Sequence, residues 1–254
     1  MRRLLIPSFT LLCLCCATLP RQTRTDVQVY GGLARSQWTE PGTSCGGFPP
    51  AVQLDNLAQV GGAIEHHHEI GLDLGVAVEA QHETVTSSRN HPSPPDGAQD
   101  WLIAGGAYVG ATQKYVAMRV GGSVWKDLAV PYVSISSGNM DKVWGNLQIG
   151  RWRPNTDTRL ASVGLGFRPV PQVTVAPWFG IVSSVLWIYP VNGRSAGGDT
   201  HWGDVQPAPG ITIDAKVNAA ISLFVQAVAA PLPSGFVGIG FSPEALLHAD
   251  DAAE

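Results

Sequence analysis

Charged residues are scarce in this chain. They make up 14% of its 254 residues, and lysine occurs only at positions 114, 126, 142 and 216. The surface of a soluble domain is normally about 25–35% charged, so this composition does not favour a wholly water-exposed surface. A formal net charge of −4 gives no electrostatic basis for binding nucleic acid. A hydrophobic content of 44% with so few charges also excludes a disordered chain.

The patterns of helical and fibrous proteins are missing as well. Beyond the N-terminal segment, no stretch approaches the roughly 18 consecutive apolar residues of a transmembrane helix. The 29 glycines and 19 prolines disfavour a helical bundle, because both residue types destabilise helix interiors. The glycines do not follow the three-residue period of collagen. These absences leave a β-rich chain of one domain.

The first 17 residues predict a signal peptide for export. Arg2-Arg3 supplies a positive start, a mostly apolar stretch follows over 4–16, and small residues at 15–17 offer a cleavage site. An uncleaved membrane anchor and a lipoprotein signal stay open as alternatives. Removal of this segment would leave Cys45 as a lone thiol, which cannot close an internal disulfide.

Apolar residues at every second position are the main signal in the remaining chain. Strand side chains alternate between two faces, so this period predicts strands. In the clearest case, 70–81, even-numbered residues are aliphatic or alanine and odd-numbered ones are small or polar. The poorest case is 127–136, because Pro131 cannot donate a ladder hydrogen bond. The expected strands cover 26–38, 56–66, 70–81, 101–112, 116–124, 127–136, 143–152, 161–168, 173–181, 211–217, 221–226 and 236–241.

Long and short connections take turns between these segments. Long polar or Gly/Pro-rich loops are expected at 39–55, 87–99 and 190–209. Such an order is typical of an up-and-down barrel with one loop-rich rim. If 127–136 is a strand, every short link falls on the other rim. We therefore predict an all-β fold, a closed antiparallel up-and-down transmembrane β-barrel of about 12 strands, with 10 as the alternative.

The two faces of the strands favour a barrel in lipid over a soluble β-sandwich. The solvent face of a sandwich should carry Lys, Glu, Thr and Arg, but here the second face is mostly Gly, Ala and Ser. A narrow lumen needs small inward residues, and closure leaves no unpaired strand edge in lipid. Aromatic residues near predicted strand ends suggest interfacial girdles: Trp38, Trp101, Tyr115, Trp125, Trp144, Trp152, Trp187 and Tyr189.

On this pattern, residues 26–241 resemble a bacterial outer-membrane β-barrel of the small, OmpA-like membrane-domain type. The final predicted strand, 236–241, resembles the insertion signal of that class, with alternating apolar residues and a closing aromatic residue. The residues concerned are Phe236, Val237, Ile239 and Phe241. The resemblance implies a barrel over 18–241, export to the outer membrane, and contact with membrane lipid and with periplasmic and outer-membrane barrel-assembly machinery. Residues 242–254 are expected to be a disordered acidic tail.

Candidate chemistry is sparse. His66 and His68 would share one face of a strand, and imidazoles suit zinc, copper or nickel, but the sequence places no further ligand beside them. We expect no metal and no cofactor there.

A lipid-modifying enzyme would need a serine beside a histidine base. His91 and Ser93 lie in a Pro-rich loop, and the Gly-x-Ser-x-Gly matches at Ser44 and Ser195 lack the strand and helix of a nucleophile elbow. We therefore expect no catalytic residues and no enzyme activity, with a lipid-modifying enzyme as the second alternative.

Charged residues on the small-residue face are the remaining candidates. We expect them to form a paired network that fills the lumen, with simple solvation of the lumen as the alternative. They are Asp73, Glu79, Arg119, Arg168, Asp214 and Lys216. The sequence thus predicts a membrane-embedded scaffold or narrow passive pore with exposed loops. A secreted soluble β-sandwich that binds a ligand is the first alternative.

Overall fold

The chain forms a closed antiparallel barrel in which β1 and β14 pair to complete the ring. The computed structural model describes residues 23–40, 51–89, 99–188, 199–229 and 233–247. Within these residues the predicted number of strands, 12, is confirmed.

The barrel strands are β1 (Arg24–Glu40), β2 (Ala51–His67), β3 (Leu72–Arg89), β4 (Gln99–Thr112), β5 (Val116–Val124), β6 (Ala129–Asn139), β7 (Val143–Gly150), β8 (Arg159–Val170), β9 (Val173–Val182), β12 (Gln206–Lys216), β13 (Ile221–Val228) and β14 (Ser234–Phe241). A separate two-stranded sheet consists of β10 (Val185–Ile188) and β11 (Asp199–Trp202), and the helix α2 (Pro243–Leu247) follows β14.

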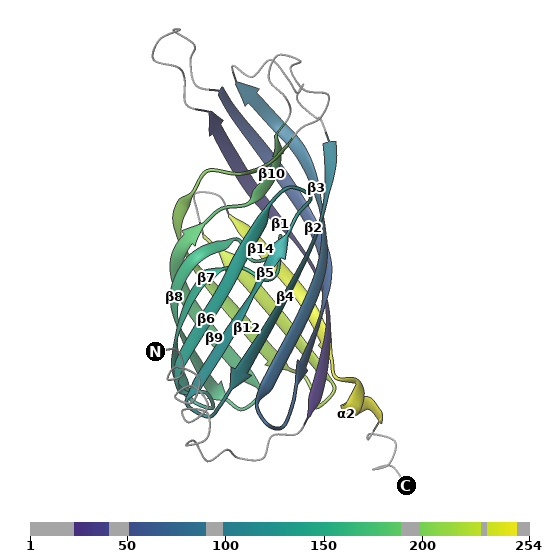
Figure 1. The fold of residues 1–254 in the computed structure, drawn as a ribbon, viewed down its shortest axis with the longest axis vertical. Helices are drawn as coiled ribbons and strands as arrows, with labels where there is room; N and C mark the ends of the chain where they lie inside the picture. The colour runs from purple at the N-terminus through teal and green to yellow at the C-terminus, as the bar shows by residue number, and fades with distance from the viewer. Residues whose placement is uncertain (1–22, 41–50, 90–98, 189–198, 230–232, 248–254) are drawn as a thin grey trace, which may run out of the picture.

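The weakest strand prediction, 127–136, corresponds to β6. Pro131 lies inside this strand, opposite Gly122 of β5, and is exposed on the outer face. With β6 in place, the short connections gather at one end of the barrel, which we call the short-turn end. The strand ends that flank residues 41–50 and 90–98 lie at the other end, which we call the loop-rich end (Figure 1).

Several strands are longer than the hydrophobic period predicts. β2 already begins at Ala51 and β3 continues to Arg89, so β1, β2 and β3 rise above the rest of the wall at the loop-rich end (Figure 1). The inward side chains of these extensions include Gln53 and Asp55. Since both faces are partly polar there, alternation of apolar residues fades although the strand continues.

Aliphatic side chains cover the outside of the barrel. Leu33 is 69% exposed and Val78 is 65% exposed, and the same face of the other strands is similarly apolar. In a β-sandwich these side chains would be packed against a second sheet. The soluble β-sandwich alternative is therefore wrong, because the sheet closes on itself and its aliphatic face points outward. Within the described residues, no helix is long and apolar enough to cross a membrane.

Four of the eight predicted girdle aromatics lie inside the barrel. Trp101 and Tyr115 are exposed, at 61% and 50%. Trp125 and Trp152 are buried inside the barrel, and two others, Trp38 and Trp144, also lie on the inward face. The side chains of residues 187 and 189 lie outside the described set. The girdle interpretation is thus wrong for these four tryptophans. Strand parity turns Trp38 and Trp144 toward the lumen, whereas Trp125 and Trp152 lie on connections that fold inward after β5 and β7.

Inward glycines make room for inward rings. A Cβ atom added to Gly75 would lie 2.1 Å from the Tyr108 ring, and one added to Gly210 would lie 2.2 Å from the Trp178 ring. Small residues on the inner face therefore do not leave a clear bore. They accommodate large side chains from the neighbouring strand, so the interior of the wall is packed.

The first residues of the predicted disordered tail are ordered. Pro243–Leu247 form the single turn of α2, with Glu244 in the first turn. The Glu244 carboxylate accepts a hydrogen bond from the backbone N–H of Thr25 at 3.1 Å, which ties α2 to the start of β1. The prediction of disorder is wrong for this turn, and residues 248–254 lie outside the described part of the chain.

Candidate functional site

The connection between β7 and β8, Arg151–Thr158, folds into the lumen, and we call it the plug. Gly150 has a φ angle of +68°, and a Cβ atom there would lie 1.6 Å from the Pro131 carbonyl oxygen. Only glycine fits this turn without strain. All plug residues except Arg153 are buried. The predicted strand 143–152 is therefore wrong in its last two residues, because the chain turns inward at Gly150.

Glu79 of β3 holds the tip of the plug. Its Oε2 atom accepts hydrogen bonds from the backbone N–H groups of Asn155, at 2.5 Å, and Thr156, at 2.9 Å. Its Oε1 atom accepts hydrogen bonds from the Thr156 hydroxyl and the Tyr30 hydroxyl, both at 2.7 Å. Glu79 is 1% exposed. Four donors therefore compensate one buried carboxylate, three of them from the plug.

Glu65 of β2 holds a second part of the plug. Arg153 donates to Glu65 Oε1 at 2.8 Å and to Gln28 Oε1 at 2.5 Å. The Tyr108 hydroxyl donates to Glu65 Oε2 at 2.6 Å, and the Arg119 guanidinium lies 4.0 Å from the same oxygen. Glu65 thus lies between an arginine of the plug and an arginine of the wall, which links the two electrostatically.

Arg151 connects the plug to a second inward segment. Its guanidinium donates to the carbonyl oxygens of Asp157 and Ser183, both at 2.9 Å. The same group lies over the indole rings of Trp202 and Trp125, at 4.7 and 5.4 Å from their centroids. Carbonyl groups and aromatic faces therefore surround this fully buried cation.

The second inward segment comprises residues 183–188 and 199–205 with the strands β10 and β11, and we call it the inner hairpin. It lies toward the loop-rich end (Figure 1). Val185 packs against Leu102 and Trp125, while Leu186 packs against Leu57 of the wall. Gln81 donates a hydrogen bond to the Val185 carbonyl at 2.8 Å. The lumen is therefore filled at two successive levels.

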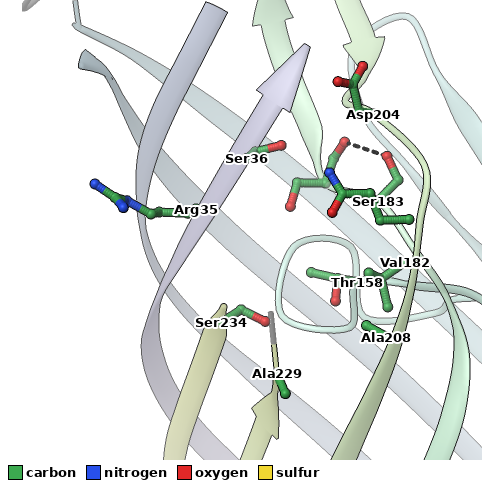
Figure 2. Close-up of a pocket in the computed structure, with 11 residues that line it drawn as sticks. Arg35, Ser36, Thr158, Val182, Ser183, Asp204, Ala208, Ala229 and Ser234 are labelled. Atoms are coloured by element: carbon green, nitrogen blue, oxygen red, sulfur yellow. Dashed lines mark hydrogen bonds between the residues drawn. The ribbon is translucent and has the colours of Figure 1, made fainter. Parts of the chain in front are cut away.

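A small cavity remains where the plug, the inner hairpin and the wall meet. Figure 2 shows Thr158, Ser183, Asp204 and Ser234 around it. The space open to the centre of a water molecule is about 20 Å³, enough for one water. Thr158 Oγ1 and Gln206 Oε1 are buried without a partner beside this cavity. A single bound water would satisfy both atoms.

The structure places the six predicted lumen charges in different environments. Asp73 and Glu79 are buried, and Arg119 lies 3.7 Å from Asp73 Oδ2. Asp73 also accepts from the Thr112 hydroxyl and lies 2.8 Å from His67 Nδ1.

The other three predicted charges are near the short-turn end and do not meet the plug. Arg168 pairs with the exposed Asp141 at 3.5 Å. Asp214 and Lys216 lie at the end of β12, where Lys216 is exposed. The expected network thus divides into a central group and a group at the short-turn end.

Sequence reasoning missed the residues that anchor the plug. Glu65 lies opposite Gly75 across β2 and β3, so it shares the inward face with Asp73 and Glu79. Strand parity extended through 56–66 would have found it. Arg151 and Arg153 gave no such signal. The plug has no apolar alternation, so its sequence resembles that of an ordinary polar loop.

The weak metal candidates lie at the short-turn end. The rings of His66 and His68 are 6.3 Å apart, His66 Nδ1 lies 3.1 Å from the Thr25 hydroxyl, and His68 Nδ1 accepts from the Ile70 N–H at 3.3 Å. In the described part of the chain, no group of three or more His, Cys, Asp or Glu residues is placed to hold a metal ion.

The other sequence candidates are placed only in part. Val237, Ile239 and Phe241 of the closing strand face outward, whereas Phe236 is buried inside the barrel. A role of these residues as an insertion signal stays a prediction. The candidate nucleophiles and base, and the lone thiol of the exported chain, lie outside the described residues: Ser44, His91, Ser93, Ser195 and Cys45.

The strand order and the outer surface decide the class of protein. The twelve strands form a hydrogen-bonded ring, which satisfies the backbone without water, and aliphatic side chains cover the outside. The chain is a transmembrane β-barrel. Its ring has more strands than the roughly eight of the OmpA type. The predicted resemblance to the OmpA type in particular therefore gains no support.

Comparison with known proteins gives low similarity throughout. No protein-family model and no curated protein matches the chain. Among solved structures, the outer membrane protease OmpT from Escherichia coli is 10% identical with a TM-score of 0.40, covering 91% of this chain and 99% of that one.

Two further structures are similarly distant. The translocator domain of the autotransporter NalP from Neisseria meningitidis is 12% identical with a TM-score of 0.33, covering 93% and 92%. A mutant of the Rh. blastica porin is 11% identical with a TM-score of 0.30, covering 86% and 99%. The assignment of this chain as a transmembrane β-barrel therefore rests on its own strand order and apolar belt.

Proposed function

We propose that this barrel is a non-enzymatic, membrane-embedded scaffold that presents its loop-rich end to the exterior and conducts solutes poorly. The observation that carries the proposal is the plug, which lies inside the barrel with its backbone bound to Glu79 and its Arg153 bound to Glu65. An open passive pore would instead need a continuous water-filled lumen.

The contacts of the plug support a stable closure. Each anchoring carboxylate receives several hydrogen bonds, and bonds to a charged group contribute about 1.5–3 kcal/mol each. Arg151 joins the plug to the inner hairpin, so both inward segments support each other. A lumen filled in this way favours a structural or surface-display role over a transport role.

The orientation follows from the two ends. The strands β1, β3 and β10 end at the loop-rich end, and β2, β4 and β11 begin there. Both described ends of the chain, near Arg24 and α2, lie at the short-turn end (Figure 1). Short turns normally face the periplasm and long loops the exterior. We therefore place partner recognition on the long loops, with membrane lipid around the belt and the barrel-assembly machinery acting during insertion.

Single-channel recording in planar bilayers tests the proposal. The wild-type protein should show only small or no current steps. A variant in which residues 151–158 are replaced by a short Gly-Ser linker should show larger steps, because one obstruction is gone and the inner hairpin loses the hydrogen bond from Arg151 that supports it. A matched control replaces the exposed turn residues Lys126 and Asp127 with Gly-Ser and should behave like the wild type. A large open conductance of the wild-type protein would contradict the scaffold proposal.

A further inference from the structure

A buried acidic group lies inside the barrel at the loop-rich end, apart from the plug anchors. It consists of Gln53 and Asp55 on β2 and Glu83 on β3, which are 0%, 1% and 1% exposed. The Gln53 amide nitrogen donates to Asp55 Oδ1 at 3.0 Å and to Glu83 Oε1 at 3.4 Å. One neutral amide thus lies between two carboxylates, all on rigid strands.

The local backbone is irregular at this point. The register between β2 and β3 shifts at Leu54/Asp55, which is a β-bulge or a similar irregularity. Bulges re-aim side chains and are frequent beside functional sites. Here the extra residue is Thr86 of β3, next to Val85, and the direct neighbours of Asp55 across the ladder are Ser36 and Val85.

Two polar atoms of this group have unmet bonding capacity. Asp55 Oδ2 and Gln53 Oε1 are both buried without a hydrogen-bond partner. Among the described residues, no ion pair of Asp55 with an arginine, lysine or histidine is present. A buried carboxylate without a compensating charge is costly, so the arrangement calls for a positive charge that the described side chains do not supply to Asp55.

The group lies outside the membrane-spanning belt. On the outer face, Arg35 bonds to Asn56 at 3.3 Å and marks the polar edge of the belt on β1 and β2. Asp55 lies opposite Ser36, one position farther toward the loop-rich end. Burial raises the pKa of Asp55 to about 7, although the hydrogen bond from Gln53 opposes the rise.

We propose that a divalent cation, Ca²⁺ by its chemistry, binds between Asp55 and Glu83, with the amide oxygen of Gln53 as a third ligand. A 180° rotation of the Gln53 side-chain amide about its Cγ–Cδ bond exchanges the positions of Nε2 and Oε1. Oε1 then faces both carboxylates. Carboxylate and amide oxygens are the ligands of hard cations. Ca²⁺ accepts irregular sets of oxygens, whereas Mg²⁺ demands near-ideal octahedral geometry, which these three side chains on two rigid strands are less suited to supply.

Calorimetric titration of the full-length protein in detergent with CaCl₂, after treatment with a chelator, tests this site. We expect one binding event in the wild type and binding at least about tenfold weaker in Asp55→Asn and in Glu83→Gln, because each loses a ligand charge. Both substitutions preserve side-chain shape and remove a buried negative charge, so neither should prevent folding. Asp141→Asn, at an exposed position of the short-turn end, serves as the matched control and should bind like the wild type.

Thermal unfolding separates the cation from a shared proton. CaCl₂ should raise the Tm of the wild type and of Asp141→Asn at pH 7.5, but not that of Asp55→Asn or Glu83→Gln. A wild type that binds no Ca²⁺, or Ca²⁺ binding that is unchanged in both variants, would overturn the proposal. Stabilisation by acid alone, with no effect of CaCl₂, would also overturn it and assign the carboxylate pair to a shared proton.

Discussion

Replacing Glu79 with alanine should release the tip of the plug from the barrel wall. The substitution removes the acceptor of two backbone N–H groups, from Asn155 and Thr156, and of the Thr156 hydroxyl. Hydrogen bonds to a charged acceptor contribute about 1.5–3 kcal/mol each, and the buried donors would be left unsatisfied, so we expect a loss of about 4 kcal/mol or more. A loss of about 4 kcal/mol changes the ratio of docked to undocked plug by about a thousandfold.

Current recordings and urea unfolding in detergent measure this effect. Glu79→Ala should show frequent, larger current steps and a lower free energy of unfolding. Glu79→Gln keeps one carbonyl acceptor, so its current steps and its free energy of unfolding should lie between those of the wild type and those of Glu79→Ala. Asp214→Ala removes an inward carboxylate that does not touch the plug and should leave the current unchanged. If Glu79→Ala conducts and unfolds like the wild type, the reasoning that this carboxylate holds the plug is refuted.

Three further predictions concern the wall and the loop-rich end. Because the pKa of Asp55 is raised to about 7, the chelator-treated protein should lose stability as the pH rises from about 4 to 7, and Asp55→Asn should remove that part of the pH dependence of the urea midpoint. Gly75→Ala should cost about 1–3 kcal/mol of unfolding free energy because a ring occupies the space of its Cβ, whereas Gly105→Ala, with 3.7 Å to its nearest neighbour, should be almost neutral. In liposome-folding assays, Val76→Arg on the apolar belt should cost about 2–4 kcal/mol and Thr84→Arg at the edge about 0–1 kcal/mol, and equal costs would contradict the position of the belt.

The wall of the barrel could be predicted because its outer face must be apolar at every second residue. The period is clean in 70–81, where the structure places β3. It also located β6 in spite of Pro131. The period failed at the loop-rich end of β2, since Asn56 is polar on the outer face and Leu57 is apolar on the inner face, which breaks the alternation there.

The filled lumen was only partly predictable. Parity assigned Asp73 and Glu79 to the inward face, but what they bind comes from a loop that is distant in sequence. Thr156 is 77 residues from Glu79 along the chain. Such a contact depends on the chain reversal at Gly150, which has a positive φ angle. In a glycine-rich chain, the presence of one glycine does not predict such an angle. Sequence periodicity therefore predicts the strands of the barrel wall better than the segments that fill its lumen.

Reactivity of a cysteine in the plug tests the central claim most directly. Thr156→Cys, in a chain whose own cysteines are replaced by serine, places a thiol of similar size at a position that is 4% exposed. An exposed control is Asp127→Cys in the β5–β6 turn. With a charged, membrane-impermeant maleimide on the folded protein in liposomes, the account predicts rapid labelling of the control and almost none at position 156. Equal labelling of the two thiols would show that the plug is not inside the barrel.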